Sequence, residues 1–124
     1  MVRIIVLTGA AVALAVGVAS QALGQGASTP TLMGTVGPSF TITLTKGGKP
    51  VKTLKAGTYM VSVNDKSASH NFTLERQTKP KIEKHVTSTA FTGTKSMRVV
   101  LKKGNWKYYC SVHEALMHGT FKVN

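Results

Sequence analysis

Residues 95–124 read KSMRVVLKKGNWKYYCSVHEALMHGTFKVN, and their pattern decides the fold class. Apolar and polar residues alternate on both sides of a Lys103-Gly104-Asn105 turn, and a period of two predicts two strands. A further strand is predicted at residues 119–123, GTFKV, which closes the chain. Trp106, Tyr108 and Cys110 share one face of the second strand. We expect this aromatic face to point inward and to carry Cys110 into the interior at the end of its strand.

The same alternation occurs upstream. It is found in SFTITLTKGGKPV at residues 39–51, KAGTYMVSVND at residues 55–65 and HNFTL at residues 70–74. Phe40, Ile42 and Leu44 are expected on one buried face of the first of these stretches. Only the basic loop from Glu75 to about His85 lacks a clear pattern, and no window predicts an amphipathic helix of useful length. Short strands separated by glycine turns predict an all-β domain, a sandwich or barrel with about 7–8 strands.

The amino terminus has the three-part pattern of a secretory signal peptide. Arg3 is the one charge before an apolar run from Ile4 to Ala19, and Ala22-Leu23-Gly24 is a plausible cleavage site. We expect residues 1–24 to be removed and residues 25–124 to form a single exported domain, periplasmic or extracellular, without stable membrane insertion. A retained anchor is the alternative, although this apolar core is short and poor in large residues for a bilayer.

The charge balance is strongly basic. The formal net charge is +12 at neutral pH, and loss of Arg3 with the leader leaves +11. Such a surface attracts acidic partners by electrostatic steering. Nucleic acid is not expected, because the chain is predicted to be exported and has no aromatic–basic recognition motif. The domain is expected to be a monomer.

Cys110 is the only cysteine of the chain, so it cannot form an internal disulfide. Outside the cytoplasm an odd cysteine is a reactive thiol, half of an intermolecular bridge or a metal ligand. A bare thiol would become oxidised there, whereas metal ligation protects it. An inert buried cysteine would need apolar neighbours on both sides, but Ser111 and His113 follow Cys110.

Further soft-metal donors lie close to this cysteine in the sequence. His113 and Met117 lie in the connection from Cys110 to the last strand, and His70 begins an upstream strand that could lie beside the Cys110 strand. A thiolate, two imidazoles and a weak thioether form the ligand set of a blue-copper site. Zinc is the rival metal, but a thioether is a poor zinc ligand and copper binds a given site more tightly. His118 is an alternative to Met117 as the fourth ligand.

At this point the sequence resembles a known family. YYCSVHEALMHGTFKV is similar to the carboxy-terminal ligand loop of the cupredoxins, the plastocyanin-like small blue copper proteins, with the Cys-x2-His-x3-Met spacing of the amicyanin type. SASHNFTL is similar to the upstream ligand segment of that family. The resemblance implies a Greek-key β-sandwich of two sheets and one type 1 copper ion. It also implies that His70, Cys110 and His113 are equatorial ligands, that Met117 is axial, and that Asn71 fixes the surrounding loops by hydrogen bonds.

The motif departs from the family in two places. Val112 stands where plastocyanins and amicyanins have proline, and its free amide is expected to donate to the Cys110 sulfur and to raise the reduction potential. Tyr109 matches an exposed tyrosine that plastocyanins use for docking, but its sequence neighbours here are lysines, so a partner bound there should be acidic. Ala115 and Leu116 are expected to form an apolar docking patch around His113.

These observations favour a non-enzymatic one-electron carrier that cycles between Cu(I) and Cu(II). An enzyme with Cys110 as a nucleophile, activated by His70 or His113, would leave Met117 without a role. A protein for copper storage or delivery would use the same ligands and remains the alternative. His85 and His118 are expected at the surface.

Overall fold

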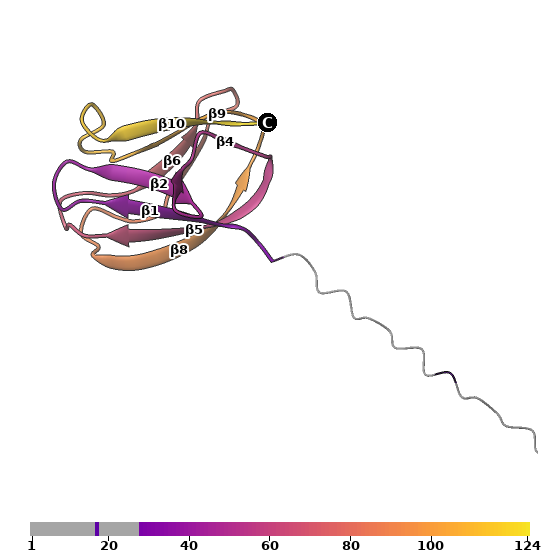
Figure 1. Ribbon diagram of the computed structural model, residues 1–124. Coiled ribbons are helices and arrows are strands. Elements are labelled where there is room, and N and C mark those ends of the chain that lie inside the picture. The colour runs from indigo at the N-terminus through magenta and orange to yellow at the C-terminus, as the bar shows by residue number, and fades with distance from the viewer. Residues whose placement is uncertain (1–16, 18–27) are drawn as a thin grey trace, which may run out of the picture.

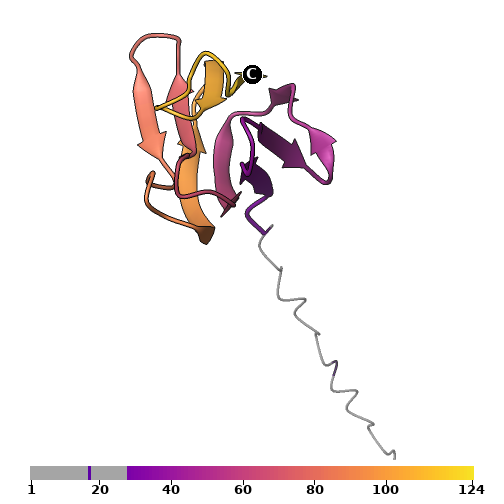
Figure 2. The ribbon, with the colours of Figure 1, turned by 90° about the vertical axis from the view of Figure 1, so that its left-hand side faces the viewer.

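The computed structural model describes Gly17 and residues 28–124, and the latter form a sandwich of two five-stranded sheets (Figure 1, Figure 2). The first half of the domain contains β1 (Thr31–Val36), β2 (Ile42–Lys46), β3 (Lys49–Pro50), β4 (Thr53–Leu54) and β5 (Gly57–Asp65). The second half contains β6 (Thr73–Arg76), β7 (Ile82–His85), β8 (Gly93–Leu101), β9 (Gly104–Tyr109) and β10 (His118–Val123). The predicted leader and its cleavage site lie outside the described residues, apart from Gly17.

Each sheet contains strands from both halves of the domain. The first sheet has the order β3-β2-β1-β5-β8, and the second has the order β4-β10-β9-β6-β7. The pairs β1–β5 and β4–β10 are parallel, and the remaining pairs are antiparallel. Eight of the ten strands are four residues long or longer, and β3 and β4 have two residues each. The prediction of a Greek-key β-sandwich is confirmed, with two short strands beyond the expected 7–8.

The core lies between the sheets because each long strand buries alternate residues. Tyr59, Val61 and Val63 face inward from β5, as their alternation predicts. From the second sheet, the Trp106 ring packs on the Phe121 ring with centroids 6.2 Å apart. Buried aromatic and branched apolar side chains of this kind are the main source of stability in such a domain.

Two expectations about strands are wrong. Phe40 precedes β2 and is 56% exposed, so it does not belong to the buried face of that strand. The basic segment after Glu75 is not a patternless loop, because β6 and β7 form an antiparallel hairpin there. Arg76 closes this hairpin by donating hydrogen bonds to the Thr78 and Pro80 carbonyls, each at 3.1 Å. Because these contacts are polar, the sequence of the hairpin shows no hydrophobic periodicity.

The described part of the chain contains no helix that is long and apolar enough to cross a membrane.

Candidate metal centre

Cys110 directly follows β9, and residues 110–117, here called the downstream segment, form a closed turn before β10. The Cys110 amide donates to the Met117 carbonyl at 3.0 Å, and the Met117 amide donates to the His113 carbonyl at 2.9 Å. The His113 amide donates to the Cys110 carbonyl at 3.2 Å. Because the turn is closed by its own backbone, the three-residue step from Cys110 places His113 beside the sulfur.

His70 comes from residues 65–71, here called the upstream segment, which includes the last residue of β5 and most of the connection to β6. The His70 amide donates to the Ser67 carbonyl at 3.3 Å, and the Ser67 amide donates to Oδ1 of Asp65 at 3.1 Å. Gly37, with φ at +74°, lies against this turn. A Cβ atom at Gly37 would lie 3.0 Å from the Ser67 Cβ and 3.5 Å from the His70 Cδ2. The upstream segment is therefore held partly by the β1–β2 connection.

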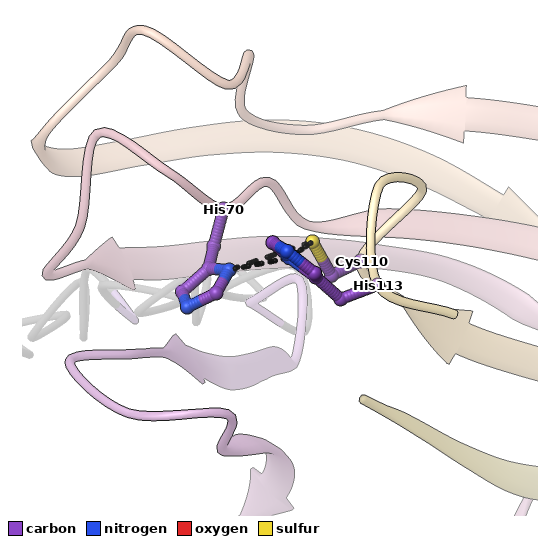
Figure 3. A group of neighbouring side chains, drawn as sticks. All are labelled: His70, Cys110 and His113. Atoms are coloured by element: carbon purple, nitrogen blue, oxygen red, sulfur yellow. Dashed lines mark hydrogen bonds between the residues drawn. The ribbon is translucent and has the colours of Figure 1, made fainter. Parts of the chain in front are cut away.

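The side chains of His70, Cys110 and His113 face one another (Figure 3). The two Nδ1 atoms are 3.0 Å apart, and each lies 3.8 Å from the Cys110 sulfur. The point equidistant from these three atoms is about 2.1 Å from each, within the range of about 2.0–2.3 Å for metal–nitrogen and metal–sulfur bonds in zinc sites. Cys110 is 0% and His70 is 4% exposed, whereas His113 is half-buried. The three donors therefore fit a single metal ion in a nearly closed site.

Asn71 connects the two segments. Its Oδ1 accepts a hydrogen bond from the Ser111 amide at 2.8 Å, and its Nδ2 donates to the Ser111 hydroxyl at 2.6 Å and to Thr89 Oγ1 at 3.4 Å. The Asn71 backbone amide points to the Cys110 sulfur at 3.5 Å. Within residues 28–124, the Val112 amide makes no such contact with the sulfur. The expected role of Asn71 agrees with these contacts, and the amide contact expected of Val112 belongs to Asn71 instead.

Comparison with known proteins identifies the family. Residues 48–124 match the family described as copper-binding proteins of the plastocyanin/azurin family. The chain belongs to this family. No curated protein sequence gives a significant match.

Solved structures agree in fold. Rusticyanin from Thiobacillus ferrooxidans is 21% identical, with 80% of this chain and 79% of that chain covered and a TM-score of 0.53. Auracyanin A, a "blue" copper protein from Chloroflexus aurantiacus, is 19% identical, with 78% of this chain and 100% of that chain covered and a TM-score of 0.54. At these identities the similarity shows the cupredoxin fold.

In this cupredoxin, His70, Cys110 and His113 are positioned to bind one copper ion in a type 1 site. The donor chemistry agrees, because two imidazoles and a thiolate form the trigonal set of blue-copper centres. The three residues come from two segments that are 40 residues apart in sequence.

The two candidates for a fourth ligand lie in different environments. Met117 is fully buried in the core and directly precedes β10. His118 is exposed, and its Nδ1 lies 2.8 Å from the Glu114 carbonyl oxygen. These positions favour Met117, and ligation by its thioether stays a prediction. The expectation that His118 lies at the surface is confirmed.

Tyr109 does not have the exposure expected of a docking residue, since it is only 5% exposed. Its hydroxyl donates to Oε2 of Glu75 at 3.3 Å, and the Lys107 ammonium lies 4.3 Å from the centroid of its ring. Lys107 in turn forms ion pairs with Glu75 and Glu114. Burial first, and then the negative charges of Glu83 and Glu75, raise the pKa of the Tyr109 phenol. Lys107 lies at the ring as the sequence suggests, but all three glutamates of the chain also gather there, so the surroundings of Tyr109 are not purely basic.

The exposed Phe40 is a contact that the sequence did not predict. Its ring centroid lies 5.6 Å from that of His70 and 5.1 Å from that of His113. The alternation of apolar residues along a strand cannot predict this contact, because Phe40 reaches the site from the β1–β2 connection in the other sheet. His85 is exposed as expected, although it lies in β7 and pairs with Glu83 at 2.8 Å.

Proposed function

We propose that this protein is an exported type 1 copper protein that acts as a one-electron carrier. The observation that supports this best is the triangle of two Nδ1 atoms and one sulfur, with edges of 3.0, 3.8 and 3.8 Å, inside a hydrogen-bonded frame. Bound copper would supply the Cu(I)/Cu(II) couple. The residues of the chain supply a fixed ligand geometry and exclude water from most of the site.

The enclosure of the site favours electron transfer over copper storage or delivery. Cys110 and His70 are buried, so an acceptor protein cannot reach these ligands without opening the site. Asn71 holds the two ligand segments together through its side chain. A frame that is already assembled changes little between oxidation states, which suits repeated electron transfer.

The surface around His113 fits contact with a redox partner. His113 is the half-buried member of the triangle, and Phe40, Val112 and Leu116 around the site are 56%, 53% and 66% exposed. Exposed apolar side chains beside the half-buried ligand are typical of a surface that contacts another protein. The basic charge of the chain favours a partner with an acidic surface, because charge complementarity raises the rate of encounter.

Met117 would complete the proposed site as a weak fourth ligand. It is fully buried, and the exposed His118 is engaged by the Glu114 carbonyl. A weak fourth donor adds electron density to the metal, and this stabilises Cu(II) more than Cu(I) because Cu(II) carries the higher charge. Replacement of Met117 by Leu removes this donor, so it should leave the blue colour and raise the reduction potential.

Addition of Cu(II) to the purified apoprotein tests the proposal. We expect an intense blue colour that disappears on reduction and is absent in Cys110→Ala. His85→Ala is the matched control, because His85 is exposed and outside the triangle, and it should stay blue. A pale complex that does not depend on Cys110 would contradict the proposal. Rapid loss of Cu(I) to a chelator, without reversible redox cycling, would favour delivery instead.

A further inference from the structure

Asp65 is a buried acidic residue at the end of β5, and it is 1% exposed. The alternation of the strand places its side chain on the inward face with Val61 and Val63. Oδ1 accepts the Ser67 amide, but Oδ2 is buried and is the one buried side-chain nitrogen or oxygen without a hydrogen-bond partner within residues 28–124. A buried polar atom without a partner destabilises the folded state, so such an atom in a folded protein calls for an explanation.

The position of Asp65 connects it to the metal centre. Its carboxylate holds the Ser67 amide, and the Ser67 carbonyl holds the His70 amide. The same turn packs against Gly37, next to the His70 ring. Asp65 therefore stabilises the turn that positions His70, which lies five residues later in the sequence.

The charge of Asp65 has no partner either. The ion pairs within the described residues involve the glutamates, and none reaches Asp65. A buried charge is screened much less by water and salt than an exposed one. Because Cu(II) carries one more positive charge than Cu(I), a buried negative charge in this corner stabilises the oxidised state more than the reduced state.

We propose that Asp65 is a positioning residue that builds the turn before His70 and lowers the reduction potential of the site through its buried charge. This inference rests on the proposed function, because it requires copper to be bound and to cycle. It explains why an acidic residue with an unpartnered oxygen lies inside this corner of the sandwich.

Asp65→Asn tests the role of the charge alone, because it removes the charge and keeps the hydrogen bond that forms the turn. Asparagine keeps a side-chain oxygen for the Ser67 amide and nearly the same volume, but it has no charge. We expect the copper-loaded variant to keep the blue absorption spectrum and to have a higher reduction potential by voltammetry. If the amide variant does not fold, Asp65→Ser keeps a smaller acceptor and gives the same test.

Glu83→Gln is the matched control, because it also removes one negative charge but from an exposed side chain of β7. Its effect on the potential should be small and should disappear at high salt, whereas the shift in Asp65→Asn should persist. An unchanged or lower potential in Asp65→Asn, or a shift no larger than that in Glu83→Gln, would overturn the role of the charge.

Asp65→Ala tests the positioning role, because it removes the acceptor as well as the charge. We expect it to release copper to a chelator about 10-fold faster than Asp65→Asn, with an altered spectrum. Equal retention and equal spectra in the two variants would overturn the role of the turn. A wild-type protein without a blue, reversible couple would overturn the proposed function and this inference together. A normal wild-type couple with no shift in Asp65→Asn would overturn this inference alone.

Discussion

The two segments that supply the metal ligands are built in different ways. The downstream segment is closed by its own backbone, with hydrogen bonds from Cys110 to Met117 and between His113 and both of them. The upstream segment depends on distant residues, since the Lys66 amide donates to the Val36 carbonyl and Gly37 packs against Ser67 and His70. A ligand in a self-closed turn needs only its spacing, whereas a ligand held by distant contacts needs the whole fold.

The largest effect should come from removal of the connection between the two segments. Asn71→Ala loses the hydrogen bonds to the Ser111 amide and hydroxyl. We expect the free energy of unfolding to fall by about 1–3 kcal/mol, and copper affinity to fall about 10–100-fold. Denaturant unfolding and competition with a chelator measure the two quantities. Thr89→Ala is the control, because it removes only the longer contact at 3.4 Å and should cost much less. Equal losses in the two variants would contradict a connecting role for Asn71.

The dependence of the upstream segment on the β1–β2 connection can be tested with a pair of glycines. Gly37→Ala should cost about 1–3 kcal/mol, because an alanine at φ +74° is strained and its Cβ would press on Ser67. Gly47→Ala has a similar φ, +57°, but no atom lies within 4 Å of the added Cβ. It should cost about 1 kcal/mol from the backbone alone. Only Gly37→Ala should alter the copper spectrum, and a changed spectrum in Gly47→Ala would show that the effect is not local to His70.

The self-closure of the downstream segment predicts that its external ion pair matters little. Glu114→Gln removes the pair with Lys107, but Lys107 keeps Glu75 as a partner and Glu114 is exposed. We expect a loss below about 1 kcal/mol, as is usual for exposed pairs, and an unchanged copper spectrum. Thermal unfolding and absorption provide the measurements. A changed copper spectrum in Glu114→Gln would mean that this turn also needs outside support.

The smallest effect should be a change in the alkaline stability of the domain at Tyr109. Burial and nearby glutamates raise the pKa of this phenol in the folded protein, while the unfolded chain keeps a value of about 10. Above that pH the unfolded state loses the proton more readily, so the stability contributed by Tyr109 falls as the pH rises. Tyr109→Phe should make the unfolding free energy less dependent on pH above about pH 10. Tyr108→Phe should have a smaller effect, because only burial raises the pKa of Tyr108. If the unfolding free energies of wild type and Tyr109→Phe fell equally with rising pH, this prediction would be wrong.

Local patterns explain what could be predicted from the sequence. The strands at residues 55–65 and 95–109 alternate in hydrophobicity because one face of each packs against the other sheet. Cys110 and His113 could be paired from their spacing, because the turn that joins them is local. For His70 the sequence offers only the residue type and its place just before a strand, because the contacts that hold it come from distant residues.

Contacts between distant residues explain what could not be predicted. The β6–β7 hairpin depends on Arg76 and the carbonyls that it binds, so it has no hydrophobic period. Tyr109 is covered by Lys107 and by a glutamate from β6, which sequence neighbours do not reveal. The Asn71 amide reaches the Cys110 sulfur from 39 residues away in the sequence. Each of these contacts depends on how the strands of the second sheet are aligned with one another.

Glu75, Glu83 and Glu114 lie near one ring and are three of the four acidic residues of the chain, so negative charge is unevenly distributed in this basic domain. In the field of an acidic partner, such a molecule rotates during its approach, before any contact forms.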